Sequence, residues 1–127
     1  MAEENSQLQA IGQFLIERAQ LGPQDGPIIY RDLARQFGYS PPGKNWSAHP
    51  FCQIFAALDQ EDTDCQRPFR TVLVVSQSKG MPGPGFFKTV KQFRNISVPY
   101  EEDARREFFR QELECLYQYW RTRSEGV

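Results

Sequence analysis

Residues 72–87 read VLVVSQSKGMPGPGFF, in which a run of aliphatic side chains leads directly into a stretch rich in glycine and proline. The valines and the threonine of residues 71–75 favour the pleated, buried surface of a sheet. We therefore predict a strand over residues 67–76, a tight turn over residues 77–80 and a return over residues 81–87. Together these segments would form a short β-hairpin.

Apolar residues three and four positions apart predict helices in the rest of the chain. The predicted helices cover residues 6–20, 30–39, 49–60 and 97–123, with a shorter one over residues 88–96. We expect Ser6 to cap the first helix and either Ser47 or His49 to cap the third. Gly38 is placed to end the second, because glycine adopts the left-handed conformation that often closes a helix.

The chain of 127 residues is long enough to bury a core as one domain without disulfide or metal support. We take residues 6–96 as its body and residues 97–123 as a C-terminal helix. The apolar stripe of that helix would either pack on the core or form a groove or dimer contact for a partner. The stripe consists of Phe109, Leu113, Leu116 and Trp120.

No motif in the sequence indicates a catalytic or metal site. The three cysteines, Cys52, Cys65 and Cys115, form no Cys-x-x-Cys pair, and the chain has one histidine. Phosphate-binding loops, dinucleotide fingerprints and nucleophile elbows are missing as well. We therefore expect no enzyme, no cofactor and no metal. The catalytic alternative is a thiol reaction at Cys52 assisted by His49, against a structural role of both in capping and packing.

The cellular location is predicted from the ends and the cysteines of the chain. The N-terminal residues MAEENSQ are acidic and polar, unlike a signal peptide, and no apolar run is long enough to span a bilayer. An odd number of widely spaced cysteines is typical of a reducing compartment. We expect a cytoplasmic protein.

The charges are segregated although the formal net charge is only −1. Residues 1–64 hold nine acidic and four basic side chains, and residues 101–127 hold seven acidic and five basic ones. Residues 65–100 hold six basic side chains and no carboxylate. Such a basic segment either contacts phosphates or another anionic partner, or is neutralised internally by the acidic segments. The six cations are Arg67, Arg70, Lys79, Lys88, Lys91 and Arg94.

The order of three helices followed by a strand–turn–strand is that of a winged helix-turn-helix, an α+β domain in which the third helix enters a DNA groove. We therefore predict a small winged-helix-like domain with a short β-hairpin wing and a long C-terminal helix. The residues predicted to contact nucleic acid are Tyr30, Arg31, Lys44, Asn45, Trp46, His49, Gln53, Arg67, Arg70, Ser78, Lys79, Lys88, Lys91 and Arg94. Trp46 would either stack on a base or cover the edge of the core.

Residues 28–39, IIYRDLARQFGY, resemble the segment before the recognition helix in O6-alkylguanine-DNA alkyltransferases and alkyltransferase-like proteins. The matching residues are Tyr30, Asp32, Leu33, Ala34 and Gly38. Residues 67–80 fall where that family has its active-site strand and wing, and match at Pro68, Arg70, Val74, Val75 and Gly80. The reactive Pro-Cys-His-Arg segment of the family is replaced by Pro68, Phe69 and Arg70, and residues 49–60 lack the arginine that displaces a base. The resemblance, which covers about residues 8–87, implies DNA binding without alkyl transfer or base flipping.

These observations predict non-catalytic nucleic-acid binding, with DNA as the partner. The alternative is a protein–protein adaptor in which the basic segment 65–100 or the C-terminal helix docks an acidic partner. The sequence PGPG at residues 82–85 would be a rigid wing tip whose amides approach a phosphate, or a purely structural turn. The Tyr30 helix, the aliphatic strand and PGPGFF together also resemble small bacterial proteins, a resemblance that implies no function.

Overall fold

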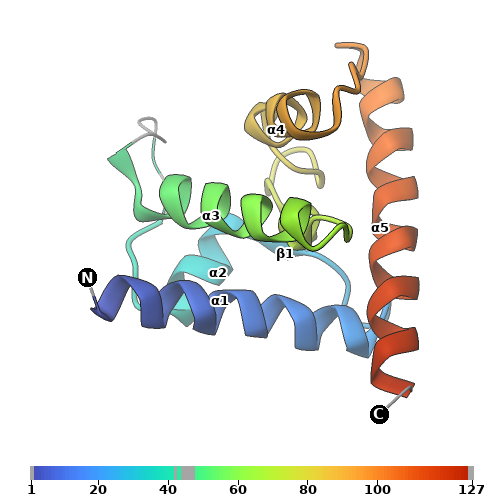
Figure 1. The fold of residues 1–127 in the computed structure, drawn as a ribbon. Coiled ribbons are helices and arrows are strands. Elements are labelled where there is room, and N and C mark those ends of the chain that lie inside the picture. The colour runs from blue at the N-terminus through green and yellow to red at the C-terminus, as the bar shows by residue number, and fades with distance from the viewer. Residues whose placement is uncertain (1, 42, 44–47, 126–127) are drawn as a thin grey trace.

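The computed structural model describes residues 2–41, 43 and 48–125, and most of these residues are helical (Figure 1). Helix α1 lies beside α3, α4 covers one side of the molecule, and α5 stands across the end of α1. The elements in chain order are α1 (Ala2–Leu21), β1 (Ile28–Ile29), α2 (Tyr30–Gln36), α3 (Pro50–Asp64), the 3₁₀ turn η2 (Arg70–Leu73), β2 (Val74–Val75), α4 (Pro84–Arg94) and α5 (Glu102–Glu125).

The prediction of an α+β winged-helix domain with a β-hairpin wing is wrong. The strands found in the described residues are β1 and β2, which pair in parallel with Ile28 opposite Val74 and Ile29 opposite Val75. Parallel strands cannot be joined by a tight turn, so this pair is not a hairpin. Over the residues that the structure describes, the fold is a small helical one with one two-residue ladder.

The predicted strand over residues 67–76 is reduced to two residues because its first half is held by carboxylates of α3. The Asp62 carboxylate accepts a hydrogen bond from the Arg70 backbone N–H at 2.9 Å, and the Asp59 carboxylate accepts one from the Thr71 hydroxyl at 2.7 Å. These bonds hold residues 70–73 in the turn η2. All residues from Phe69 to Val75 are buried, so the run lacks the alternation that marks a half-exposed strand.

The segment PGPG is the start of a helix and not a wing tip. Gly83 is the N-cap residue of α4 and Pro84 takes its first helical position, where the missing N–H of proline leaves no hydrogen bond unmade. The predicted helix over residues 88–96 therefore begins earlier, at Pro84. Phe86 and Phe87 are buried on its first turn, and Val90 follows them into the core.

The other predicted helices exist with shifted bounds. Ser6 lies inside α1, so the predicted cap at Ser6 is wrong. The predicted cap at His49 is confirmed, since Nδ1 of His49 accepts a hydrogen bond from the Phe51 N–H at 3.0 Å. Ser47, the other candidate, lies outside the described residues. Gly38 follows α2 with a φ of 79°, as its predicted role requires.

Helix α5 packs on the body of the protein through its apolar stripe. Phe109, Leu116 and Trp120 are buried, and α5 contacts α1 and η2. The structural alternative for this stripe, packing on the core, is the one observed. None of the helices in the described part of the chain has the length and apolar character needed to cross a membrane.

A buried ion cluster joins α3 to the turn η2. Asp62 and Arg70 have 0% and 3% of their surface exposed, and Nε of Arg70 donates to Asp62 Oδ1 at 2.9 Å. Nε of Arg67 reaches the same oxygen at 2.6 Å, and Glu61 accepts from both arginines at 3.1 Å. The guanidinium of Arg70 lies over Gly12 of α1, where an added Cβ would stand 2.7 Å from Nη1. The cluster therefore fixes three elements against one another.

Candidate ligand-binding pocket

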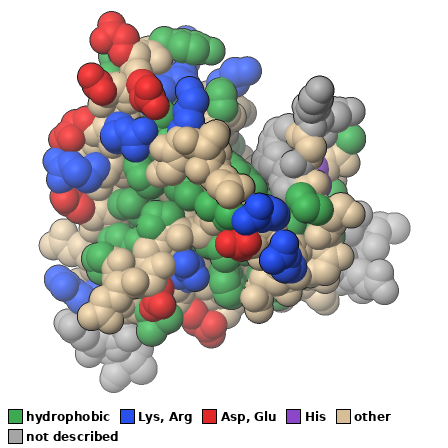
Figure 2. Space-filling model, turned by 180° about the vertical axis from the view of Figure 1, so that it is seen from behind, with side chains coloured by type: hydrophobic (Ala, Val, Ile, Leu, Met, Phe, Trp, Pro, Cys, Tyr) green, Lys and Arg blue, Asp and Glu red, His purple; other side chains and the backbone are tan. Residues whose placement is uncertain are grey.

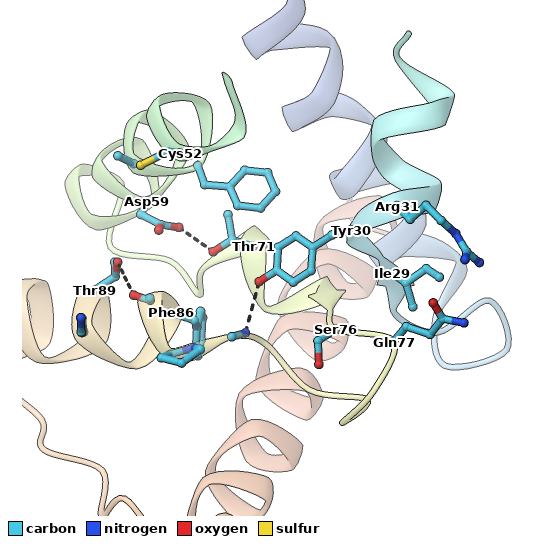
Figure 3. A pocket seen from close by; sticks show the side chains of 16 residues that line it. Ile29, Tyr30, Arg31, Cys52, Asp59, Thr71, Ser76, Gln77, Phe86 and Thr89 are labelled. Carbon is cyan, nitrogen blue, oxygen red and sulfur yellow. Dashed lines mark hydrogen bonds between the residues drawn. The ribbon is translucent and has the colours of Figure 1, made fainter. Parts of the chain in front are cut away.

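A pocket of about 620 Å³ opens beside the β1–β2 pair, between α2, α3, η2 and the start of α4 (Figure 3). Tyr30 directly follows β1, and Ser76 directly follows β2. Because the strands are parallel, the segments that follow them leave the ladder at the same edge. Tyr30, Arg31, Ser76 and Gln77 therefore line one side of the pocket.

The walls of the pocket are mainly apolar and aromatic. The ring of Tyr30 lies 6.1 Å from that of Phe55, measured between centroids, with 32° between their planes. Ile29, Ala56 and Phe86 complete much of the apolar lining. A volume of several hundred Å³ with such walls and a few polar groups is typical of small-molecule sites.

The Asp59 carboxyl is the principal polar group of the pocket and is only 4% exposed. Burial raises its pKa to about 7; the neighbouring Asp62 carboxylate also raises it, while the Thr71 hydrogen bond, Arg70 and Arg94 lower it. Oδ1 accepts the hydrogen bond from Thr71. In the part of the chain that the structure describes, no group donates a hydrogen bond to the other oxygen, Oδ2. The carboxyl thus changes charge near neutral pH and retains acceptor capacity.

The Tyr30 hydroxyl joins α2 to the start of α4. It accepts a hydrogen bond from the Gly83 N–H at 3.2 Å. Burial raises the pKa of this phenol and Asp59 raises it further, whereas the Gly83 bond lowers it, so the phenol stays protonated at neutral pH. The hydroxyl is therefore a neutral hydrogen-bonding group of the pocket.

The rim of the pocket carries two cations. Lys88 is exposed on α4, and Arg31 is exposed on α2 with its Nε 3.7 Å from Asp32. The Arg31 side chain points away from Asp59 and Thr71 in Figure 3. Cys52, half-buried on α3, also lines the rim, while Cys65 and Cys115 are exposed elsewhere. The two cationic side chains of the rim are thus exposed to solvent, whereas the Asp59 carboxyl is buried.

The structure brings three of the residues predicted to contact nucleic acid into this pocket, namely Tyr30, Arg31 and Lys88. His49 caps α3, with Nε2 2.7 Å from the Ser40 carbonyl oxygen. Gln53 is exposed on α3 and is not part of the pocket lining. Lys44, Asn45 and Trp46 lie outside the described residues.

The basic residues of segment 65–100 do not gather into one field. Arg67 and Arg70 belong to the buried ion cluster, and Arg94 forms an ion pair with Glu112 while stacking 4.2 Å above the Phe69 ring. Ser78 and Lys79 are exposed in the turn after β2, and Lys91 is exposed on α4. On the face shown in Figure 2, lysine and arginine side chains are interspersed with acidic ones. Internal neutralisation, one of the two interpretations of the sequence, applies to the three arginines.

Sequence reasoning missed Asp59, Asp62 and Thr71. Helical spacing could have pointed to the burial of Asp62. This residue continues the buried stripe of α3, four residues after Leu58 and seven after Phe55. Carboxylates on a buried helical face require buried partners, and Arg70 and Thr71 follow shortly afterwards in the chain. The third helix was instead predicted to end at residue 60, whereas α3 continues to Asp64.

Comparison with known proteins identifies no relative of this chain. Among the described residues, no group of histidine, cysteine and carboxylate side chains is arranged to hold a metal ion. The resemblance to alkyltransferases stays a prediction from the sequence, without the wing on which it partly depended. No protein-family model, curated protein or solved structure matches this chain.

Proposed function

We propose that the protein binds a small, largely apolar organic molecule in the pocket beside Tyr30 and Asp59 and performs no chemistry on it. The observation that carries this proposal is a buried carboxyl at 4% exposure set among aromatic walls. Burial of an incompletely hydrogen-bonded carboxyl is costly, and carboxyls with a pKa raised by burial are concentrated at functional sites. A bound molecule with a hydrogen-bond donor would supply the partner that Oδ2 lacks among the described residues.

The absence of chemistry in this proposal is supported by the contacts of His49. Its two ring nitrogens are engaged with the Ser40 carbonyl and the Phe51 N–H. The imidazole is therefore not oriented as a base for Cys52, and a nucleophilic thiol requires such a base or another source of activation.

Nucleic-acid binding stays a prediction that the pocket proposal does not require. Arg67, Arg70 and Arg94 already pair with carboxylates, which reduces the cations available to phosphates. Among the basic residues of segment 65–100, such binding would now depend on Lys79, Lys88 and Lys91, which are exposed. The protein–protein alternative likewise depends on these lysines, since the apolar stripe of α5 is in the core.

The proposal is tested by recording amide chemical shifts while small aromatic and aliphatic fragments are added. We expect concentration-dependent shifts at Asp59, Thr71, Gly83 and Gly85, which belong to the pocket. Ala56→Leu places a larger side chain in the pocket and should abolish the shifts. Gln53→Leu is the matched control, because Gln53 is exposed on the same helix outside the lining. Equal shifts in both variants, or no shifts with any fragment, would contradict the proposal.

A further inference from the structure

We infer that the molecule bound in this pocket carries a protonated amine, which pairs with the Asp59 carboxylate beside the aromatic rings of Tyr30 and Phe55. This inference rests on the proposed function and specifies its ligand class. The shared chemistry is an alkylammonium group on an apolar stem, found both in free amines and in the lysine side chain of a protein.

The first argument is the hydrogen-bonding state of Asp59. Thr71 donates to Oδ1 at 2.7 Å, and Oδ2 receives no donor from the described residues. An ionised carboxylate accepts up to about four hydrogen bonds and an ammonium offers three donors. An ammonium group therefore complements this site more fully than a hydroxyl, which supplies one donor and no charge.

The second argument is the aromatic wall. Tyr30 and Phe55 form a tilted pair 6.1 Å apart, and both line the pocket together with Asp59. A cation within about 6 Å of such a ring centroid is attracted by the negative face of the ring. The same rings bury the stem of an alkylamine, so one wall serves both parts of the ligand.

The third argument concerns the other charged groups that face Asp59. Asp62 lies three residues away on α3 and holds Arg70 of η2, while Arg94 of α4 is paired with Glu112. These arginines are thus already matched by carboxylates. At the rim, Arg31 lies beside Asp32, and Lys88 is exposed to water, where its repulsion of a cation is screened.

Binding of an amine is coupled to proton release from Asp59. Its pKa is raised to about 7, mainly by burial, so the carboxyl is protonated in the empty pocket at acidic pH. An ammonium stabilises the charged carboxylate, and binding below pH 7 must therefore displace the proton. Affinity rises about tenfold for each pH unit between pH 5 and pH 6 and levels off above the pKa.

The test compares three probes of similar shape, namely phenethylamine, phenethyl alcohol and 3-phenylpropionate, by amide chemical shifts at about pH 5.5 and about pH 8. We expect the amine to bind at least tenfold more tightly than the alcohol at the higher pH and to lose about thirtyfold in affinity at the lower pH, because only a few per cent of the Asp59 carboxyl is ionised there. Alcohol or propionate binding as tightly as the amine would overturn the inference while leaving the proposed function intact. Failure of all three probes would overturn both.

Asp59→Asn separates the charge from the shape of the site. The asparagine retains a carbonyl oxygen, which can still accept the hydrogen bond that the Thr71 hydroxyl donates to Asp59 at 2.7 Å. We expect this variant to lose both the preference for the amine and its pH dependence. Asp64→Asn is the matched control, an exposed carboxylate on the same helix, and should change neither. Equal amine affinity in the Asp59→Asn variant and the wild type would contradict the inference.

The source of the amine is distinguished by a peptide arm. A short peptide with one lysine flanked by glycines is titrated beside phenethylamine under the same conditions. Tighter binding of the peptide would identify the lysine side chain of a protein partner as the ligand. Tighter binding of phenethylamine would identify a free amine as the ligand, because its aromatic ring then adds apolar contacts that a lysine flanked by glycines cannot make.

Discussion

The hydroxyl of Thr71 donates a hydrogen bond of 2.7 Å to the Asp59 carboxylate, and both side chains are buried. This contact links η2 to α3 and orients the carboxyl within the pocket. It also stabilises the charged form, which opposes the effect of burial on the Asp59 pKa. The η2 segment therefore contributes, against the larger effect of burial, to the charge of the pocket at neutral pH.

Asp59 makes the protein less stable as pH rises. Its pKa in the folded protein is about 7, well above the value of 3.8 for an exposed aspartate, so between these values the unfolded chain binds fewer protons. The free energy of unfolding therefore falls across this range, by roughly 4 kcal/mol at about 1.4 kcal/mol per pH unit. Urea denaturation at both ends of the range should show this fall in the wild type and a smaller one in Asp59→Asn. Identical slopes in the two proteins would contradict the prediction.

Loss of the Thr71 hydroxyl should shift the pH range of amine binding upward. Thr71→Val keeps the shape of the side chain but removes the donor that lowers the Asp59 pKa. Amine affinity at a fixed neutral pH should then decrease, and the pH at which it levels off should rise. Thr71→Ser retains the hydroxyl and is the control that should leave the pH profile unchanged.

The buried ion cluster predicts an asymmetric response to charge removal. Asp62→Asn leaves the buried Arg70 without its main counter-charge and should cost about 3–5 kcal/mol of unfolding free energy. Glu61→Gln removes a carboxylate with 49% of its side chain exposed from the same arginines and should cost less than about 1 kcal/mol. Denaturant unfolding of both variants provides the measurement, and equal losses would show that burial does not set the energetics here.

Gly12→Ala is expected to destabilise the protein although alanine favours helices. The added Cβ would stand 2.7 Å from Nη1 of Arg70 and 3.0 Å from a methyl carbon of Leu58. Because Arg70 is held by Asp62, its guanidinium cannot move aside without weakening that pair. We expect a net loss of about 1–3 kcal/mol by thermal or urea unfolding. A gain in stability would show that the guanidinium has room to rearrange.

Cys52 offers a direct reporter of occupancy. In a Cys65→Ser and Cys115→Ser background, a maleimide can react with Cys52 alone, which lines the pocket rim. Saturating phenethylamine should slow this labelling, whereas phenethyl alcohol at the same concentration should have a smaller effect. The control restores Cys115, which is exposed outside the lining and should react at an unchanged rate.

The nucleic-acid prediction is tested by fluorescence anisotropy with short single- and double-stranded DNA at two salt concentrations. If DNA is a partner, affinity should weaken with salt and fall when Lys88 and Lys91 are changed to Gln, because exposed cations release counterions from phosphates. Absence of binding at low salt would remove DNA as a partner. The amine titration is unaffected by that outcome.

The sequence predicted the helices well and the sheet poorly, for reasons that differ between elements. The stripes of α1, α3 and α5 repeat every three or four residues, and their central members, such as Leu15, Leu58 and Leu116, are fully buried. The aliphatic run of residues 72–75 has no such period. A fully buried run is compatible with a strand or a turn, and the hydrogen bonds to α3 decide between them.

The pocket could not be predicted from the sequence, because the residues that line it come from segments far apart in the chain. Tyr30 was singled out for nucleic acid, and Gly83 for a wing, yet a hydrogen bond joins the two. Asp59 was not among the predicted site residues, because an aspartate near the end of a predicted helix is normally expected to be exposed to solvent. Its burial depends on the return of Thr71 to α3, which only the tertiary fold specifies.

The parallel pairing of β1 with β2 has a consequence for the order of folding. The two strands lie far apart in the chain, so their pairing requires closure of a long loop that contains α2 and α3. The helices can form locally before that closure, but the edge that places Tyr30 beside Ser76 cannot. Local opening of this short ladder would disrupt the pocket while α1 and α5 stay packed. A ligand that stabilises the pocket should therefore slow amide hydrogen exchange at Ile29 and Val75 before it affects the helices.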